Sequence, residues 1–314
     1  MLETVDATEG KKACTSQDLL LPDAKLEKLH TGMTWCEGPV YFPSSDTLMF
    51  SDIPNHQLLQ WVPDLGTRVV NLDSNYTNGN TRDQSGRRIS CEHLSNSVVR
   101  IEGDGTRTVL ASTYNGKRLN SPNDVVVSGD GAVWFTDPSY GIMSDHEGRA
   151  RASEQEGCFV YRIDPHSGEC KVVCDSLIMP NGLAFSADEQ TLYIADSSRS
   201  HFPDANHHVF AFDVESGGTL ANQRIFYEVV HGVPDGMRVD EYDNLWCSSA
   251  RGVEIISPDG HQINHIAVPE VVANLTFGGP EGNRLFITAT SSLYAIYVGV
   301  RGVDSPLAQS HKSK

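Results

Sequence analysis

The chain has 314 residues, of which 24 are Lys or Arg and 41 are Asp or Glu, so its formal net charge is −17. This acidic balance repels phosphate backbones and anionic lipid headgroups, which argues against nucleic-acid binding and membrane binding. Charged residues make up 21% of the chain and aromatic residues 8%, so it can bury a large core, and disorder is excluded for most of its length.

Residues 1–17 lack the pattern of a secretory leader. Glu3, Asp6 and Glu9 stand where a leader has basic residues followed by an apolar stretch. The seven cysteines are spread along the chain without a tight framework, and reduced thiols explain them most simply. We therefore expect a cytoplasmic protein whose residues 1–20 form a loose N-terminal segment.

Six segments repeat one pattern along the chain: a short strand, a polar turn with Gly, Asp or Asn, and a second apolar strand. Further strands follow most of these hairpins, such as 56–62 and 68–72 after the first one. Four antiparallel strands in about 40–50 residues are typical of a β-propeller blade. The sequence therefore predicts an all-β protein, a six-bladed β-propeller of four-stranded antiparallel blades. A sandwich or several small β domains would not explain six similar units.

The two ends of the chain complement each other. The sixth unit has no fourth strand after Val298, while a spare strand, 25–31, precedes the first unit. If this N-terminal strand completes the last blade, the ring closes without an open sheet edge. We expect a single propeller domain over residues 21–301, followed by a polar C-terminal tail over 302–314.

Two units are lengthened by polar insertions, at 139–156 and 198–206. Both insertions follow the second strand of a blade, so both are expected on the same face of the disc. Long loops that gather on one face of a scaffold are usually functional.

The first residues of the six units form what we call the axial ring, because the innermost strand of each blade lines the central channel. The ring consists of Glu37, Asn78, Asn123, Asn181, Asp235 and Asn274. Asn and Asp also cap turns everywhere, but six of six facing one axis favours a metal site. Carboxylate and amide oxygens suit Ca²⁺ first, with Mg²⁺, Mn²⁺ or Zn²⁺ as alternatives, and two carboxylates neutralise one divalent cation.

Other catalytic motifs are missing from the sequence. It has no GxSxG nucleophile elbow, HExxH zinc motif, Walker A loop or dinucleotide fingerprint. The twelve histidines are scattered, and a lone histidine on a strand is more often packed or solvated than functional. Only His93 and the pair His207 and His208 draw notice, and the sequence assigns them no role.

Four motifs in order resemble the SMP-30/gluconolactonase/LRE-like family, which includes regucalcin-type sugar lactonases. They are EGPVY at 37–41, SPNDVVVSGDGAVWFTDP at 121–138, MPNGLAFSAD at 179–188 and VPDGMRVD at 233–240. Together with GNTRDQSGRRISCEH at 79–93, they look most like the microbial gluconolactonases. The resemblance implies a six-bladed propeller that hydrolyses sugar lactones with one divalent metal ion.

The resemblance also implies roles for individual residues. Glu37, Asn181 and Asp235 match the metal ligands, and Asn123 matches a fourth ligand or a substrate contact. Asp235 would also act as the acid/base group, and Asp124 matches the adjacent acidic residue of the motif. Animal members carry an arginine where this chain has Ser121, so Asp137, Tyr140 and the 139–156 insertion become candidates for binding the substrate.

The reaction expected from this resemblance is hydrolysis of an aldono-1,5-lactone such as gluconolactone to the aldonic acid. The metal ion would polarise the lactone carbonyl, and Asp235 or a metal-bound water would handle the proton. Two alternatives stay open: a calcium-dependent phosphotriesterase or aryl-esterase on the same scaffold, and a non-catalytic propeller that binds protein partners. The sequence leaves the oligomeric state open.

Overall fold

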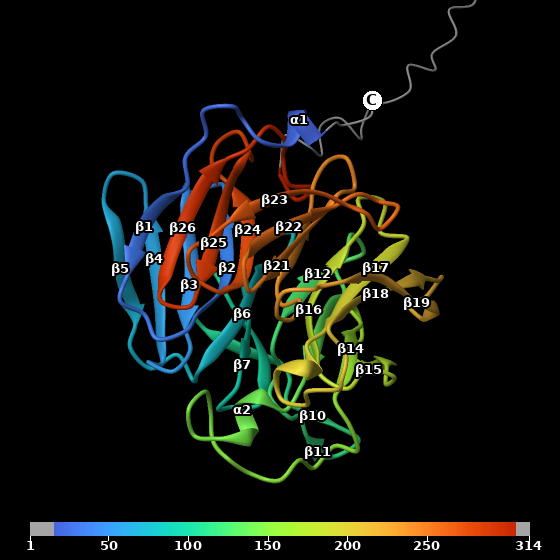
Figure 1. Cartoon of the computed structure of the whole chain (residues 1–314). Coiled ribbons are helices and arrows are strands. Elements are labelled where there is room, and N and C mark those ends of the chain that lie inside the picture. Colours follow the sequence, from blue (N-terminus) through green and yellow to red (C-terminus); the bar gives the residue numbers. More distant parts are fainter. Residues whose placement is uncertain (1–15, 306–314) are drawn as a thin grey trace, which may run out of the picture.

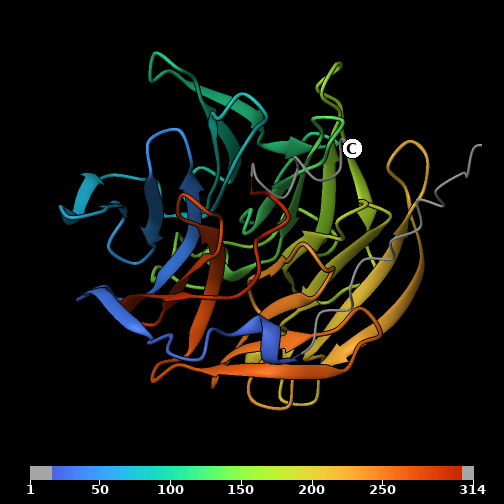
Figure 2. The same ribbon diagram turned by 90° about the horizontal axis from the view of Figure 1, so that it is seen from above.

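A computed structural model describes residues 16–305 of the chain. These residues form six four-stranded antiparallel sheets and one two-stranded hairpin. Viewed from above, the sheets follow one another around a central axis in chain order, and the blue N-terminal strand lies next to the red C-terminal strands (Figure 2). The predicted six-bladed β-propeller is therefore confirmed.

Each of the first three blades is a meander that runs from the axis outward (Figure 1). The first blade contains β2 (Cys36–Phe42), β3 (Thr47–Asp52), β4 (Gln57–Val62) and β5 (Gly66–Asn71). The second contains β6 (Thr77–Arg82), β7 (Arg88–Glu92), β8 (Ser97–Ile101) and β9 (Arg107–Ala111). The third contains β12 (Val125–Val127), β13 (Val133–Asp137), β14 (Phe159–Ile163) and β15 (Cys170–Cys174), and the small hairpin β10 (Thr113–Tyr114) and β11 (Lys117–Arg118) precedes it.

The remaining three blades repeat this order. The fourth contains β16 (Pro180–Phe185), β17 (Thr191–Asp196), β18 (His208–Val214) and β19 (Leu220–Glu228). The fifth contains β20 (Met237–Val239), β21 (Leu245–Ser249), β22 (Gly252–Ile256) and β23 (Gln262–Ala267). The sixth contains β24 (Val272–Gly278), β25 (Arg284–Ala289), β26 (Ser292–Tyr297) and the N-terminal strand β1 (Glu27–Thr31).

Burial falls from the axis to the rim of each blade. In the first blade, six of the seven residues of β2 are buried, whereas four of the six residues of β5 are exposed. The apolar faces of neighbouring blades pack against each other, for example through Trp246 and Phe277, whose ring centroids lie 5.2 Å apart. The rigid inner strands therefore fix the positions of the residues that begin them.

The ring closes as the sequence predicts. Strand β1 pairs antiparallel with β26, with Glu27 opposite Ala295 and Thr31 opposite Ser292. Glu270 supports this closure, because its carboxylate accepts hydrogen bonds of 2.6 Å from both the Ser292 and Tyr294 hydroxyls. Lys28 of β1 lies 3.5 Å from the same carboxylate.

The folded part of the chain extends beyond the expected domain limits. Helix α1 (Ser16–Leu19) precedes β1, and Leu19, which has no exposed surface, belongs to the core of the last two blades. Leu20 forms a bridge with Val298. Burial of Leu19 therefore holds residues 16–20 against the propeller, although we expected them to be loose. Of the expected polar tail, residues 302–305 also pack here, while 1–15 and 306–314 lie outside the described residues.

The two insertions meet on one face, as expected. Helix α2 (Tyr140–Met143) lies in the first insertion, at the end of the disc away from α1 (Figure 1), and the 3₁₀ turn η1 (Ser198–Ser200) lies in the second. The rings of Tyr140 and His201 contact each other across the two loops, with centroids 5.4 Å apart. Among residues 16–305, no helix has the length and apolar character that crossing a membrane requires.

Candidate metal and lactone site

The axial ring forms at the start of the six inner strands, on the face that carries the insertions. Five of its members are at most 6% exposed, and Asp235 keeps part of its surface accessible. Contacts between blades bring the ring residues together. The Asn274 side chain donates a 3.1 Å hydrogen bond to the Glu37 carboxylate, and the Asn181 side chain hydrogen-bonds to the Asp235 carboxylate.

The two ring carboxylates repel each other in a buried setting. Burial, followed by repulsion from Asp124, raises the pKa of Glu37 to about 8. Burial also raises the pKa of Asp235 well above its ordinary value, with further contributions from the charges of Glu37 and Asp124. Within residues 16–305, no Lys or Arg forms a salt bridge with any of these three carboxylates. Such a cluster fits a bound cation, which would compensate the charge.

Asp124 adds a third carboxylate next to the ring. It is 2% exposed, and its Oδ1 accepts a 2.9 Å hydrogen bond from the Val125 amide, whereas its Oδ2 has no hydrogen-bond partner among the described residues. Burial raises the pKa of Asp124, and the charge of Arg238 opposes this shift. The positive charge of Arg238 therefore acts on Asp124.

Glycines after the ring residues allow the inner strands to lie close together. A Cβ atom on Gly38 would overlap the backbone of Asn78 in the next blade, and one on Gly182 would overlap the backbone oxygen of Asp235. A Cβ atom on Gly79 would likewise overlap the backbone of Asn123, and one on Gly236 would overlap the Asn274 side chain. The repeated pairs EG, NG, NG and DG in the sequence are the signal that could have revealed this packing.

Hydroxyl groups of the second strands hold the ring backbone in place. Ser51 and Thr136 each donate a 2.8 Å hydrogen bond to a ring carbonyl of the following blade, that of Asn78 and Asn181 respectively. The Asp235 amide donates a 3.1 Å bond to the Ser248 hydroxyl. These bonds come from rigid strands and fix the direction in which the ring side chains point.

The 139–156 insertion brings a fourth carboxylate to the ring. The charge of Glu147 contributes to the raised pKa values of both Glu37 and Asp235, so Glu147 lies near them. His93 connects this insertion to the ring: one ring nitrogen lies 2.8 Å from the Glu147 carbonyl and the other 3.3 Å from Asn78 Nδ2. Burial lowers the pKa of His93 to about 4, so its imidazole is neutral at physiological pH and supports the insertion. Nothing in the sequence pattern singled out Glu147.

Three predicted substrate-binding residues lie around the start of the same insertion. Burial raises the pKa of the Tyr140 phenol, and the nearby charge of Asp235 adds to this shift. Asp137 has no exposed surface, and its carboxylate accepts a 2.8 Å hydrogen bond from the Asn120 amide. Asn123 is 6% exposed at the ring, and its carbonyl accepts a 2.8 Å bond from the Gly79 amide. Asp137 therefore supports the loop before the ring residue.

Ser121 uses its side chain to anchor the insertion. Its hydroxyl donates a 2.7 Å hydrogen bond to the Pro138 carbonyl and accepts a 3.0 Å bond from the Gly141 amide. A Cβ atom on Gly141 would overlap the His93 ring, so this corner is tightly packed. Ser121 thus fixes the start of the first insertion.

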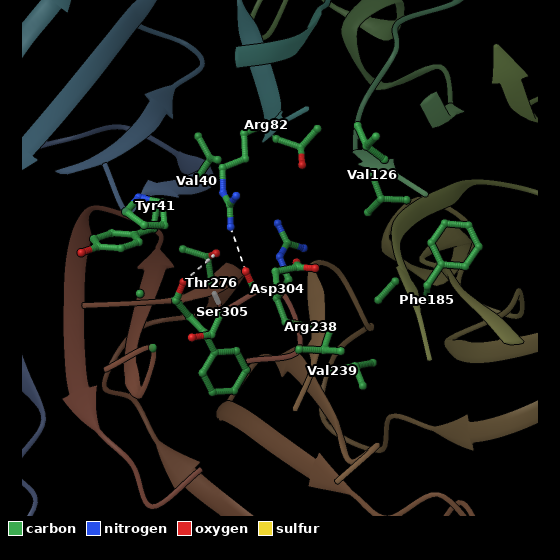
Figure 3. Close-up of a pocket in the computed structure, with 18 of the residues that line it drawn as sticks. Val40, Tyr41, Arg82, Val126, Phe185, Arg238, Val239, Thr276, Asp304 and Ser305 are labelled. Atoms are coloured by element: carbon green, nitrogen blue, oxygen red, sulfur yellow. Dashed lines mark hydrogen bonds between the residues drawn. The ribbon is translucent and has the colours of Figure 1, made fainter. Parts of the chain in front are cut away.

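A cavity opens at the other end of the channel, where the inner strands finish. It has a volume of about 470 Å³, and its walls include Val40, Tyr41 and Phe185 as well as Arg82 and Arg238 (Figure 3). Arg82 donates a 2.9 Å hydrogen bond to the Asp304 carbonyl there. The predicted ring residues do not line this cavity, so the cavity and the carboxylate cluster lie at opposite ends of the inner strands.

Comparison with known proteins agrees with this architecture. The chain is 29% identical over 295 residues to a gluconolactonase from Zymomonas mobilis, covering 86% of this chain and 80% of the relative. It is 26% identical over 260 residues to a pentonolactonase from Haloferax volcanii, covering 80% of each. The structure of a gluconolactonase from Xanthomonas campestris superposes with a TM-score of 0.83 at 37% identity, covering 90% of this chain and 91% of that one. Residues 35–291 match the family described as the SMP-30/gluconolactonase/LRE-like region, and the chain belongs to this family.

Proposed function

We propose that this protein is a lactonase that hydrolyses a sugar lactone, in the first place an aldono-1,5-lactone such as gluconolactone, to the aldonic acid. Family membership and the lactonases among its relatives support an enzyme of this class. The observation that carries the proposal is the cluster of Glu37, Asp124 and Asp235, which is buried and has no salt bridge to a cationic side chain among the described residues. Within this cluster Asp235 keeps part of its surface accessible, and the position beneath two polar insertions suits a substrate with many hydroxyl groups.

The ligand set that we propose consists of Glu37, Asn181 and Asp235, with Asn123 as a fourth ligand or a substrate contact. These hard oxygen donors favour Ca²⁺, and Mg²⁺, Mn²⁺ and Zn²⁺ remain alternatives. When bound, the cation supplies Lewis-acid polarisation of the lactone carbonyl. The hydrogen bonds to Glu37 and Asp235 from Asn274 and Asn181 orient the carboxylates before any ion arrives.

Asp235 is the proposed acid/base group. As the ionised carboxylate, Asp235 would accept a proton from the attacking water as the new C–O bond forms. The bond between the acyl carbon and the ring oxygen then breaks, and the same proton goes to the departing ring oxygen. Tyr140 and the 139–156 insertion form the proposed wall that holds the sugar hydroxyls and excludes bulk water.

Substitution of Asp235 tests this assignment. In D235N, kcat for gluconolactone should fall about 10²–10⁴-fold, the range for loss of a general acid/base group, and a pH-indicator assay measures it. D240N is the matched control, because Asp240 is a fully buried carboxylate of the same blade whose bonds go to Asn244 and Trp246. Near-normal hydrolysis by D235N with Ca²⁺ still bound contradicts the role of Asp235. Full activity of the wild type in excess chelator contradicts the metal-dependent lactonase altogether.

A further inference from the structure

A second group of potential metal ligands lies away from the axial ring. Among residues 16–305, one group of three His, Cys, Asp or Glu side chains has ligand atoms that all lie within 4.8 Å of one another: His207, His208 and Glu228. The group sits where β18 begins and β19 ends, so it belongs to the outer half of the fourth blade. We propose that these three side chains bind a transition-metal ion of the zinc class.

His207 is already oriented as a metal ligand. Its Nδ1 lies 2.7 Å from the Val229 carbonyl, while its own carbonyl accepts a 3.1 Å hydrogen bond from the Val229 amide. A histidine that donates Nδ1–H to a carbonyl presents the lone pair of Nε2 for coordination, and this arrangement is usual for metal-bound histidines. Here Nε2 points toward Glu228, with 3.4 Å between Nε2 and the carboxylate Oε1.

The spacing between these two atoms fits one tetrahedral ion. Two ligands bound at ~2.0–2.1 Å to a tetrahedral zinc ion lie about 3.4 Å apart, which agrees with the observed separation of 3.4 Å between Nε2 and Oε1. The same separation also suits an ion pair between a protonated His207 and Glu228. The third member of the group separates these two interpretations.

His208 supplies the third ligand. It pairs with Glu228 across the strands β18 and β19, and its ring centroid lies 4.8 Å from that of His207. Its Nδ1 is buried and has no hydrogen-bond partner among the described residues. A metal ion bound at this nitrogen provides the missing partner, whereas an ion pair between His207 and Glu228 leaves it without one.

The chemistry of the group selects a different ion from the axial ring. Two imidazoles and one carboxylate suit Zn²⁺, whereas Ca²⁺ takes six to eight oxygen ligands. Glu228 is exposed, so solvent completes the coordination. The group adjoins the 198–206 insertion, whose His201 ring contacts Tyr140. The ion therefore links β18 and β19 at the base of the 198–206 insertion, which lies next to the proposed lactone site.

The test is a zinc titration of the full-length protein. The protein is stripped with chelator, saturated with Ca²⁺ to fill the axial ring, and titrated with Zn²⁺ in a calorimeter. The wild type should bind one Zn²⁺, and H208A and E228Q should each bind it about 100-fold more weakly or worse, since loss of even an outer-shell partner costs 10–100-fold. Co²⁺ in place of Zn²⁺ should show visible absorption bands in the wild type that are lost in H208A.

Two control variants test whether the loss of Zn²⁺ binding is specific to the group of His207, His208 and Glu228. H265A removes a half-buried histidine from β23 of the neighbouring blade and should bind Zn²⁺ like the wild type. E37Q, which alters the axial ring, should also retain this zinc site. Circular dichroism without metal checks that H208A is folded. If the wild type takes up no Zn²⁺ beside Ca²⁺, or if H208A and E228Q bind it like the wild type, the proposal is overturned.

Discussion

The two ends of the central channel are built from the same six inner strands, but they differ in whether their charged side chains have partners within the protein. At the axial ring, Glu37 and Asp235 face each other and Asp124 without a salt bridge to any Lys or Arg of residues 16–305. At the other end, charged groups have partners within the protein. Arg82 donates to the Asp304 carbonyl, and both oxygens of Glu189 lie within 2.9 Å of the Gly129 amide.

This difference shows that uncompensated charge, and not the size of a hollow, identifies the candidate site. The cavity at the far end has a volume of about 470 Å³, but two of its charged side chains, Arg82 and Glu189, are already hydrogen-bonded to backbone groups. At the axial ring, ionised carboxylates are unfavourable unless a positive charge compensates them.

Removal of one ring carboxylate should have the largest effect. In E37Q, Ca²⁺ binding and kcat/KM for gluconolactone should each fall about 100-fold or more, because a ligand is lost and one negative charge disappears. The metal-free variant should unfold at a higher temperature than the metal-free wild type, because repulsion of Asp235 and Asp124 is relieved. Calorimetric titration and thermal unfolding measure both effects.

A compensated carboxylate provides the control for this experiment. Glu92 is 5% exposed but forms a 2.7 Å salt bridge with Arg107. E92Q should lose stability and keep Ca²⁺ affinity and kcat. If E37Q destabilises the metal-free protein as E92Q does, the two carboxylates are equivalent, and the contrast between the channel ends fails.

The tightness of the ring end predicts the next largest effect. In G182A, the added Cβ would overlap the backbone oxygen of Asp235, so the fourth and fifth blades must separate or Asp235 must move. We expect a loss of about 1–3 kcal/mol in unfolding free energy and at least a tenfold loss in kcat. G103A is the control, because a Cβ there meets no atom within 4 Å. Equal stability of the two variants would show that the ring accommodates the added Cβ atom without strain and would contradict this prediction.

Glu270 contrasts with the ring carboxylates, because several hydrogen-bond donors stabilise its charge. Burial raises its pKa, but hydrogen bonds from Ser292, Tyr294 and Ser291 outweigh this and lower the pKa to about 2. A pKa below the ordinary value of 4.5 means that the ionised form stabilises the fold above pH 4.5 and that this contribution is lost as pH falls toward 2. In E270Q, unfolding free energy should drop by about 1–2 kcal/mol at pH 7, after allowance for solvent screening.

Urea unfolding at pH 7, 4 and 3 measures this difference. The gap between wild type and E270Q should shrink as the pH falls, because protonation removes the charge from Glu270 in the wild type. A gap that stays constant with pH would assign the effect to lost packing at the closure of β1 on β26. S292A removes one donor to Glu270 and should reproduce part of the loss at pH 7.

The repeats explain why the sequence predicts the fold and the candidate ring residues, but not the contacts made by the insertions and by the flanking segment. Each blade repeats one hairpin pattern, so the first residues of the inner strands, such as Glu37 and Asp235, occupy equivalent positions in the repeat. Insertions have no counterpart in other blades, and the position of Glu147 follows from one particular loop path. The role of His93 depends on that same path, since its ring bonds to the Glu147 carbonyl. Packing of Leu19 depends on burial that a polar flanking sequence does not reveal.

The smallest effect is expected at the far end of the channel. In R82M, the 2.9 Å hydrogen bond to the Asp304 carbonyl is lost, which should lower the unfolding free energy by about 0.5–1.5 kcal/mol. Because Arg82 lies at the opposite end of the inner strands from the axial ring, kcat, KM and Ca²⁺ affinity should stay within about twofold of the wild type. R68M, which loses two exposed hydrogen bonds to the Gln60 side chain, is the control for removing an arginine. A tenfold loss of lactone hydrolysis in R82M, with R68M unaffected, would mean that the far cavity takes part in the reaction. In that case, uncompensated charge would no longer distinguish the site from the other end of the channel.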